Sequence, residues 1–492
     1  MTKLRASKTA GAVLVLCAAT AIAAHAQTFN SLFNFDGANG DDPLYMSLVQ
    51  GVDGNLYGTT VAGGPPSAHC EPDGCGNVFK ITPDGTLTTL YNFCSQPDCS
   101  DGEQPYAGLI LGTDGNFYGT TFQGGHGPQC KPNLSYCGTI FRITPQGTLT
   151  TLYSFCRRPG CSDGNRPTGA LLEGSDGNLY GTTSSGGTYN YGTIFRLAKD
   201  GVLTTLHTFC PQTNCIEDGG WPLSGVVQGT DGELYGTTSM GGTYYCGTVF
   251  KVTLAGQLTT LHSFDETDGV APVGGLIQAV GGLFYGTTSK GGNLAWCGGE
   301  GCGTVFKITS DGVLTTLNIF NAELGAEPLG TLVQGTDKNF YGTTLYGGNI
   351  NACNGPCGAL FGITENGDYE TVHDFNGPQG ANPTGGLVQA TNGKFYGTTD
   401  LYYGTAFTLD MGLGPFVTFV QAYGKIGQIG GILGQGLTGT TAVSFNGISA
   451  NFIVVSDTFI DATVPPGATG GYVTVTTPSG TLTSNVPFRV IP

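Results

Sequence analysis

One tetrapeptide, Tyr-Gly-Thr-Thr, recurs seven times in this 492-residue chain. The copies stand 50 to 62 residues apart, at 57–60, 118–121, 180–183, 235–238, 285–288, 341–344 and 396–399. A repeat of this length indicates an architecture in which each unit buries its hydrophobic face against its neighbours. The fold must therefore be built from about seven copies of one unit.

Each unit reads as four short strands. In the copy at 221–264, the runs 223–228, 234–238, 247–252 and 258–264 are rich in β-branched and aromatic residues, and Asp231-Gly232 and Ala255-Gly256 separate two pairs of them. Asp-Gly turns between such runs are typical of antiparallel hairpins. With 85 glycines but no three-residue period, and 10% aromatic residues, the composition excludes collagen and disfavours disorder. We therefore expect an all-β protein made of four-stranded meanders.

The fourth strand occurs once where no unit precedes it, at 30–35, and it is missing after the seventh tetrapeptide. We expect the N-terminal strand, 28–35, to complete the last unit, 384–409, because this exchange closes a ring and an open solenoid would gain nothing from it. Closure of repeated sheets into a ring leaves only short, protected edges. The predicted fold for 27–411 is a seven-bladed β-propeller.

The repeat has a specific consensus. It runs Leu/Phe-Tyr-Gly-Thr-Thr, Gly-Gly, Gly-Thr-Val/Ile-Phe-Lys/Arg-Ile-Thr and Leu-Thr-Thr-Leu-x-x-Phe, and it resembles the bacterial GloVer tandem repeat over about 28–410. That family is known from secreted "choice-of-anchor" proteins with variable C-terminal attachment modules. The resemblance implies secretion and a surface role, and it brings no established catalytic residues.

The last eighty residues, 412–492, follow a different pattern. Apolar and polar residues alternate in runs such as 443–447 and 473–475, which predicts a small β-sandwich. The order Gly-x-x-Gly, Val-x-Phe-Asn-Gly, Ser-Asp-Thr and Val-Pro-x-Gly-Ala resembles an IPT/TIG immunoglobulin-like domain, which implies packing or adhesion. The stretch up to Pro492 shows no hydrophobic tail, so we expect no anchor there.

The first 26 residues read as a signal peptide. Lys3, Arg5 and Lys8 precede an apolar run at 12–24, and Ala24-His25-Ala26 is a small-x-small cleavage site. The apolar run is short for a membrane span and no second one follows, so we expect no transmembrane segment in the mature chain. A lipoprotein site at Cys17 is disfavoured because Leu16 precedes it. We expect secretion to the periplasm, the cell surface or the medium.

Fourteen cysteines form local pairs, which in a secreted protein predict disulfides. The pairs are Cys70/Cys75, Cys94/Cys99, Cys130/Cys137, Cys156/Cys161, Cys210/Cys215, Cys297/Cys302 and Cys353/Cys357. Metal binding is the rival interpretation, disfavoured because the pairs are assigned to separate blades and lack Cys-x-x-Cys spacing or a nearby His. Cys246 stands before its third strand as Cys75 does, but without a partner, and we predict a free thiol on a loop.

In a four-stranded meander the loops divide between two faces. The turns after the first and third strands share one face, and the loops after the second and fourth strands share the other. That second face holds the paired cysteines, most of the length variation and many acids, and variable loops on a rigid scaffold are where binding usually resides. The candidate ligand-binding residues on this face are Asp98, Asp101, Glu103, Asp163, Asp218 and Asp268. The densest group of these acids, at 98–103, is a candidate calcium site, and no other cofactor is expected.

Catalytic candidates are weak. The Thr pair of the tetrapeptide has no base beside it, and a hydroxyl without a base is inert. His207, His262 and His373 occupy a position that holds Tyr in other units, which favours packing. His69 and His126 have no carboxylate or Ser partner at a suitable spacing. We therefore expect that the chain is not an enzyme.

The net charge of −17 disfavours nucleic acid as a partner, because an acidic surface repels phosphates. The function expected from the sequence is that of a secreted or cell-surface, non-catalytic binding or adhesion protein. It would take a glycan, a matrix polymer or another extracellular ligand through the acidic, disulfide-bearing loops. Two alternatives remain open: a structural envelope or matrix component, and a propeller enzyme, lyase- or glycosidase-like, with a site at the ring axis.

Overall fold

The computed structural model describes residues 27–67, 69–70, 72–130, 137–211, 215–348 and 357–491. The expected signal peptide, Cys17 and Cys353 lie outside the described residues. Within the described ranges the regular structure is strands and three 3-10 turns, η1 (Pro97–Cys99), η2 (Pro159–Cys161) and η3 (Cys297–Gly299). None of the described helices is long and apolar enough to cross a membrane. The all-β class expected from the sequence is confirmed.

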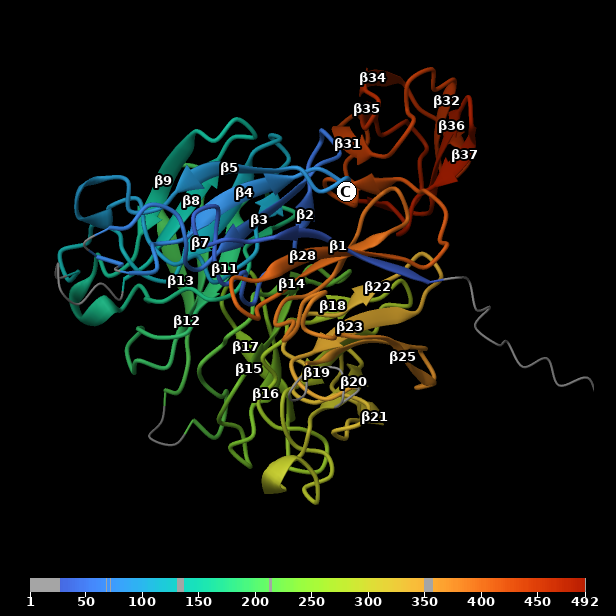
Figure 1. Ribbon diagram of the computed structural model, residues 1–492. Coiled ribbons are helices and arrows are strands. Elements are labelled where there is room, and N and C mark those ends of the chain that lie inside the picture. The colour runs from blue at the N-terminus through green and yellow to red at the C-terminus, as the bar shows by residue number, and fades with distance from the viewer. Residues whose placement is uncertain are drawn as a thin grey trace, which may run out of the picture.

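The repeat region forms seven four-stranded antiparallel sheets, named sheets 1 to 7 here in chain order (Figure 1). Sheet 1 contains β2 (Val49–Gln50), β3 (Leu56–Thr60), β4 (Asn77–Ile81) and β5 (Leu87–Asn92), and sheet 2 contains β6 (Ile110–Leu111), β7 (Phe117–Thr121), β8 (Thr139–Ile143) and β9 (Leu149–Ser154). Sheet 3 contains β10 (Leu172–Glu173), β11 (Leu179–Thr183), β12 (Thr193–Leu197) and β13 (Leu203–Thr208), and sheet 4 contains β14 (Val227–Gln228), β15 (Leu234–Thr238), β16 (Thr248–Val252) and β17 (Leu258–Ser263). Sheet 5 contains β18 (Ile277–Gln278), β19 (Phe284–Thr288), β20 (Thr304–Ile308) and β21 (Leu314–Ile319), and sheet 6 contains β22 (Val333–Gln334), β23 (Phe340–Thr344), β24 (Ala359–Ile363) and β25 (Tyr369–Asp374).

Sheet 7 combines the two ends of the repeat region. It contains β26 (Val388–Gln389), β27 (Phe395–Thr399) and β28 (Thr405–Asp410), and its fourth strand is β1 (Thr28–Asn34). β1 runs antiparallel to β28, with Thr28 opposite Asp410 and Asn34 opposite Thr405. The displaced N-terminal strand therefore pairs with the strand that the sequence assigns to it.

The Tyr, the Gly and the first Thr of the tetrapeptide have structural tasks. The hydroxyl of Tyr57 donates to Asp53 in the preceding turn at 2.8 Å, and a Cβ on Gly58 would lie 2.7 Å from the ring of Phe79. The first Thr of sheet 1 joins this sheet to the next, as Thr59 Oγ1 donates to the Ala107 carbonyl at 3.0 Å. The same bond from Thr398 to the carbonyl of Pro43, at 3.2 Å, joins sheet 7 to sheet 1.

A second set of bonds joins neighbouring sheets at their first turns. A Gln or Glu at the end of a first strand accepts from a turn amide of the preceding sheet. The bonds, of 2.8 to 3.2 Å, run from the amides of Thr391, Thr113, Ser175, Thr230, Val280 and Thr336 to the side chains of Gln50, Glu173, Gln228, Gln278, Gln334 and Gln389, respectively. Leu111 stands at this position in sheet 2. Sheets 1 and 2 are joined by the Thr59 bond and by stacking of Tyr57 on Phe117, with ring centroids 4.0 Å apart.

The residue before the proline of each repeat has a left-handed backbone. The φ angles lie between 52° and 58° at Asp42, Gln104, Arg166, Trp221, Ala271, Glu327 and Asn382. The amides of six of these residues donate to the preceding repeat, as Gln104 does to Cys75 at 2.9 Å and Asn382 to Cys357 at 2.7 Å. A backbone conformation that is costly for non-glycine residues persists where its surroundings over-determine it. These seven residues are called the rim positions below.

The C-terminal unit consists of two further four-stranded sheets. One has the order β29 (Thr418–Phe419), β31 (Ile429–Leu433), β35 (Phe459–Thr463) and β34 (Phe452–Ser456), and the other β33 (Ile448–Ser449), β32 (Ala442–Phe445), β36 (Val473–Thr477) and β37 (Gly480–Thr483). β30 (Tyr423–Gly424) and β38 (Arg489–Val490) form a parallel pair. Residues of both sheets share one core, which includes Ile460 and Val475.

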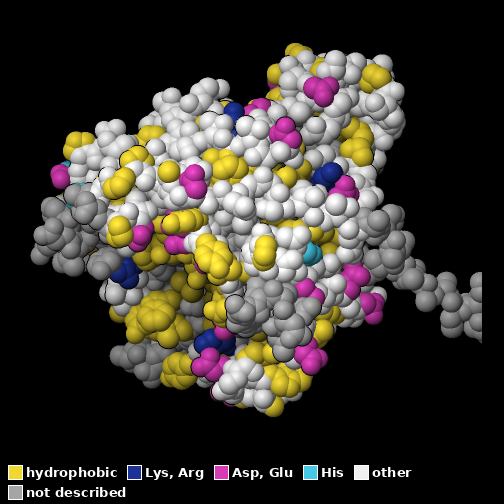
Figure 2. Space-filling view, viewed as in Figure 1, with side chains coloured by type: hydrophobic (Ala, Val, Ile, Leu, Met, Phe, Trp, Pro, Cys, Tyr) yellow, Lys and Arg dark blue, Asp and Glu magenta, His cyan; other side chains and the backbone are white. Residues whose placement is uncertain are grey.

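The C-terminal unit docks on the first turns of the repeat sheets. Thr458 Oγ1 donates to the Val52 carbonyl at 2.7 Å, Tyr423 to the Glu173 carbonyl at 3.1 Å, and Arg489 to the Gly229 carbonyl at 3.3 Å. In Figures 1 and 2 the unit projects from one side of the repeat region. The face opposite these turns, which carries the cysteine loops, is left uncovered by this unit.

Candidate functional site

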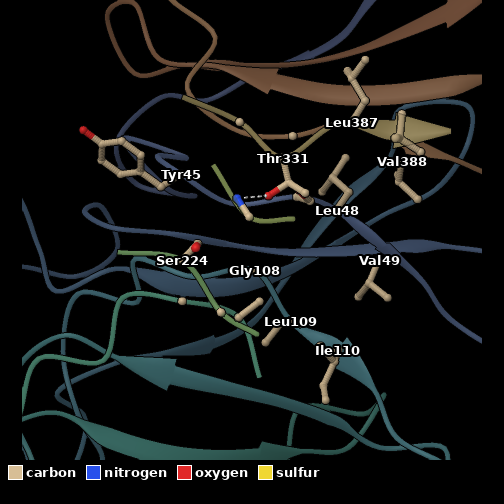
Figure 3. A pocket seen from close by; sticks show the side chains of 18 of the residues that line it. Tyr45, Leu48, Val49, Gly108, Leu109, Ile110, Ser224, Thr331, Leu387 and Val388 are labelled. Atoms are coloured by element: carbon tan, nitrogen blue, oxygen red, sulfur yellow. Dashed lines mark hydrogen bonds between the residues drawn. The ribbon is translucent and has the colours of Figure 1, made fainter. Parts of the chain in front are cut away.

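A cavity of about 780 Å³ lies where the first strands of all seven sheets converge. Each sheet contributes residues just before or within its first strand: Leu48, Leu109, Ala170, Ser224, Gly274, Gly330 and Leu387 (Figure 3). Because consecutive sheets all reach this one space, the cavity lies at the axis of their arrangement.

Small residues let the backbones meet around the cavity. A Cβ on Gly225 would lie 2.1 Å from the carbonyl oxygen of Ala170, and one on Gly385 would lie 2.0 Å from that of Met46. Both distances are far below van der Waals contact, so a side chain there would force the sheets apart. The close approach at Gly385 again joins sheet 7 to sheet 1.

The lining is apolar with a few neutral polar groups. Leu48, Leu109, Ile110 and Val388 supply much of the apolar surface, and none of the described lining residues is Asp, Glu, His, Cys, Lys or Arg. The hydroxyl of Thr331 accepts from the Gly275 amide at 2.9 Å, the bond drawn in Figure 3. The cavity can therefore hold a molecule by contact area and by neutral hydrogen bonds.

The two ends of the cavity differ. Tyr45, Tyr106 and Phe122 line the end on the cysteine-loop face, with ring centroids 6.2 Å apart for the first pair and 4.7 Å for the second. The guanidinium of Arg166, a rim position, lies 5.4 Å from the centre of the Phe122 ring. Phe419, Leu433 and Asn485 of the C-terminal unit line the other end. The aromatic end is called the mouth below.

Two of the predicted acidic residues are buried and bonded internally. Asp101 and Asp163 are 2% and 0% exposed. Each accepts a hydroxyl proton from a Tyr of the preceding strand, Tyr91 and Tyr153, at 2.7 Å, and each accepts backbone amides at the start of its own loop. Their lone pairs are used in shaping the loop, and their predicted role in ligand binding stays a prediction.

Asp218 and Asp268 occupy the same place in the loops after the fourth strands of sheets 3 and 4, opposite His instead of Tyr. His207 Nε2 lies 2.8 Å from Asp218 Oδ2, and His262 Nε2 lies 2.7 Å from Asp268 Oδ2. The remaining histidine of this set is His373 in β25. Its ring stacks on that of Phe29 of β1, with ring centroids 3.8 Å apart, and burial lowers the pKa of His373. The predicted acids therefore lie in four separate loops, with Asp98, Asp101 and Glu103 in one of them, and the structure does not gather the four loops into a single site.

The acidic residues at 98–103 differ in their exposure to solvent. Asp98 is exposed, whereas Glu103 is 3% exposed, and burial together with the charge of Asp101 raises the pKa of Glu103 to about 7. The expectation of calcium there stays a prediction.

A second acidic group, absent from the sequence-based candidates, stands near the mouth. Asp41 and Asp42 of the first loop lie beside Asp400 of sheet 7, and burial with mutual repulsion raises the pKa of Asp41 to about 6. Burial chiefly raises the pKa of Asp400 to about 6 as well. Asp400 lies more than 350 residues from Asp41 and Asp42 in the sequence, so spacing along the chain does not reveal this grouping.

Six of the seven expected cysteine pairs are disulfides within the described residues, and Cys353, the expected partner of Cys357, lies outside them. The six are Cys70–Cys75, Cys94–Cys99, Cys130–Cys137, Cys156–Cys161, Cys210–Cys215 and Cys297–Cys302. The predicted pairing is therefore confirmed for these six.

The disulfide of Cys215 is buried. Its pairing with Cys210 is the expected one. Cys215 is 6% exposed and Cys210 1% exposed, and the backbone of Cys215 is left-handed, with a φ of 49°. The Cys215 carbonyl accepts from the amides of Gly219 and Gly242, at 3.3 and 2.8 Å. This disulfide therefore stabilises the loop from its interior, because local hydrogen bonds hold the backbone around it.

The unpaired cysteine is also buried. Cys246 is free, as predicted, but it is 7% exposed, and its thiol donates to the Tyr244 carbonyl at 3.3 Å. Burial and the charges of Glu266, Asp265 and Asp268 raise its pKa, which makes it a poor nucleophile. His69 and His126 are both exposed.

The family model of the Gloeobacter/Verrucomicrobia repeat matches residues 20–217, 133–295, 213–409 and 294–450. The chain belongs to this repeat family. The resemblance of the tetrapeptide consensus to the GloVer repeat is thereby confirmed. Comparison with curated proteins gives no match.

Several solved enzyme structures are distantly similar to this repeat protein. A gluconolactonase from Xanthomonas campestris is 12% identical, with 61% of this chain and 91% of that one covered and a TM-score of 0.35. A luciferin-regenerating enzyme is 12% identical over 79% of this chain and 97% of that one, with a TM-score of 0.38. The PQQ-bound aldose sugar dehydrogenase of Streptomyces coelicolor is 15% identical over 61% and 92%, with a TM-score of 0.35.

The expected function, a non-catalytic adhesion protein acting through its acidic loops, is contradicted by these comparisons, because the matched structures are those of enzymes. At these identities and TM-scores they transfer no activity to this repeat protein. The expectation is withdrawn, and the site of interest moves from the acidic loops to the axial cavity.

Proposed function

We propose that the seven sheets are blades of one closed propeller and that its axial cavity binds a small, uncharged, largely apolar molecule. The observation that carries the proposal is the cavity itself, about 780 Å³ and lined from all seven sheets. Ligand sites typically enclose 300–1,000 Å³ and combine an apolar wall with a few placed polar groups.

The wall chemistry favours a neutral ligand. A charged molecule would lose its hydration without gaining an ionic partner, which is costly. A neutral one would gain about 25 cal/mol for each Å² of apolar surface buried. Hydroxyls such as that of Thr331 and the amide of Asn485 can orient its polar groups.

The mouth supports entry from the cysteine-loop face. Tyr45 is 44% exposed and stacks beside Tyr106, so a flat apolar molecule meets aromatic surface before it enters. The C-terminal unit, for which an immunoglobulin-like fold is part of this proposal, covers the opposite end. Secretion through a leader at 1–26 is also part of it, and the disulfides are compatible with an extracellular location.

Titration with the neutral, solvent-sensitive dye Nile red tests the proposal. We expect one saturable site with blue-shifted emission. Ala170 lines the cavity and its side chain is exposed there, so Ala170→Trp should weaken binding at least ten-fold. Val202→Trp, at a turn residue 57% exposed, is the matched control and should leave binding unchanged. Non-saturable binding, or equal binding by Ala170→Trp, would refute the assignment of the cavity.

A further inference from the structure

Two disulfides of sheet 1 lie side by side although they belong to different loops. Cys70–Cys75 closes the loop after β3, and Cys94–Cys99 closes the loop after β5. The Sγ atoms of Cys75, Cys94 and Cys99 and a carboxylate oxygen of Glu103 all lie within 4.8 Å of one another. The sequence argument against metal binding assumed that cysteine pairs stay apart, and here two pairs meet.

Glu103 is the unusual member of this cluster. It is 3% exposed, and its carboxylate lies 3.2 Å from the Sγ of Cys70. A disulfide sulfur carries no proton to donate, and this carboxylate has no other side-chain hydrogen bond among the described residues. A buried carboxylate without a donor is costly, because it leaves water without compensation. Among the described residues, the Glu103 carboxylate therefore lies against the disulfide sulfurs without a hydrogen-bond donor.

We propose that reduction of these two disulfides creates a site for a thiophilic divalent cation such as zinc, with Cys75, Cys94, Cys99 and Glu103 as its four ligands. Zinc binds thiolates at about 2.3 Å and carboxylates at about 2.0–2.2 Å, in tetrahedral geometry. Ligand atoms around such an ion are about 3.5–4 Å apart, and the cluster is already nearly this compact. The metal gives Glu103 the partner that it lacks in the disulfide form.

The conversion balances with a dithiol as reductant. Each protein disulfide takes two electrons and two protons from one dithiol, which becomes a cyclic disulfide, and yields two protein thiols. The cation then displaces the protons of three thiols, and that of the Glu103 carboxyl where it is protonated. Zinc itself changes no oxidation state.

The next repeat provides a natural comparison. Cys130–Cys137 and Cys156–Cys161 close the corresponding loops of sheet 2, and Asn165 stands where sheet 1 has Glu103. No other group of three or more Cys, His, Asp or Glu donors is as compact among the residues that the structure describes. The proposal therefore singles out one repeat, and it does not depend on what the axial cavity binds.

Cobalt(II), a spectroscopic substitute for zinc, tests the site in the full-length chain after reduction with dithiothreitol and its anaerobic removal. We expect one tight equivalent with the visible bands of a tetrahedral, thiolate-rich complex, and displacement by zinc. Glu103→Asn, which copies sheet 2, should weaken binding at least ten-fold. Cys156→Ser/Cys161→Ser should leave it unchanged, whereas Cys94→Ser/Cys99→Ser should abolish it.

Alkylation provides a second readout. Zinc should protect Cys75, Cys94 and Cys99 from iodoacetamide in the reduced chain while Cys297 and Cys302 react, as peptide mass spectrometry can show. Equal alkylation of all five, including equal alkylation because the reduced chain has unfolded, would overturn the proposal. So would cobalt binding that survives Cys94→Ser/Cys99→Ser.

Discussion

The substitution Gln50→Leu removes two of the hydrogen bonds that join sheet 1 to sheet 7. The Gln50 side chain accepts from the Thr391 amide at 2.9 Å and donates to the Thr391 hydroxyl at 2.9 Å. Gln50 is 7% exposed and Thr391 has no exposed surface. Sheet 2 already carries Leu111 at the equivalent place, so the backbone accepts this side chain.

The expected cost follows from burial. Two hydrogen bonds are lost at about 1 kcal/mol each, and a buried amide left without an acceptor adds about 1–3 kcal/mol. Contact made by the new leucine offsets part of this, so we expect a loss of about 2–4 kcal/mol in the free energy of unfolding. Gln278→Leu breaks the same kind of bond to Thr230, which is exposed. Water replaces the lost partner there, so the loss should be about 0.5–1 kcal/mol.

Urea denaturation followed by intrinsic fluorescence measures the difference. The midpoint should fall more for Gln50→Leu than for Gln278→Leu, with the slope of the transition unchanged. Equal midpoints for the two variants would refute the argument that a buried closing bond holds the ring together. A changed slope would show that the two variants unfold from different native states.

Three further predictions concern buried polar groups. Tyr153→Phe removes a hydroxyl from the fully buried Asp163 and should cost about 1.5–3 kcal/mol of stability, measured by urea denaturation. Asp400→Asn should raise stability at pH 8 and change it little below pH 4, because the folded-state pKa of Asp400 is raised to about 6 from an ordinary value of 3.8. In the unreduced protein, Cys246 should be the one thiol that maleimide labels, slowly in the folded state and rapidly in urea.

Each of these has its own check. Tyr91→Phe should cost less than Tyr153→Phe, because the Ser95 hydroxyl still reaches Asp101 at 3.1 Å. A carboxyl with a raised pKa stabilises the fold while it is protonated and loses that contribution as pH rises from about 4 to about 6. A benefit of Asp400→Asn that is the same at pH 4 and pH 8 would therefore count against the assigned pKa. Labelling of no cysteine in urea would mean that Cys246 has a partner.

The architecture could be predicted from the sequence because residues of the repeat interact with near neighbours in the chain. Asp53 and Tyr57 are four residues apart and bond each other, and Asp-Gly turns fix the register of the first hairpin. The displaced strand at 28–34 could be assigned to β28 because the seventh repeat was the one unit that lacked a fourth strand. Such signals depend on short-range spacing, which a sequence displays directly.

The location and the residues of the candidate site could not be predicted in the same way. The axial cavity depends on where seven distant segments converge, and its residues, such as Ser224 and Gly330, carry no chemistry that singles them out. A sequence signal was present in six of the repeats, namely the small residues that follow the proline, but it gave no volume. The acids were conspicuous by type, yet Asp163 and Asp218 proved to be bonded within their own loops. Charge in a sequence does not reveal whether a carboxylate faces solvent or a buried donor.

The rim positions have a consequence for how this scaffold can diversify. Seven residues with the same backbone conformation carry Asp, Gln, Arg, Trp, Ala, Glu and Asn side chains. Main-chain bonds hold that conformation at six of them, so the fold is indifferent to which side chain is displayed. Changes at well-separated positions act independently. At these six positions the side chains around the cysteine-loop face can therefore change one at a time while the main-chain bonds keep the backbone at the others as it is.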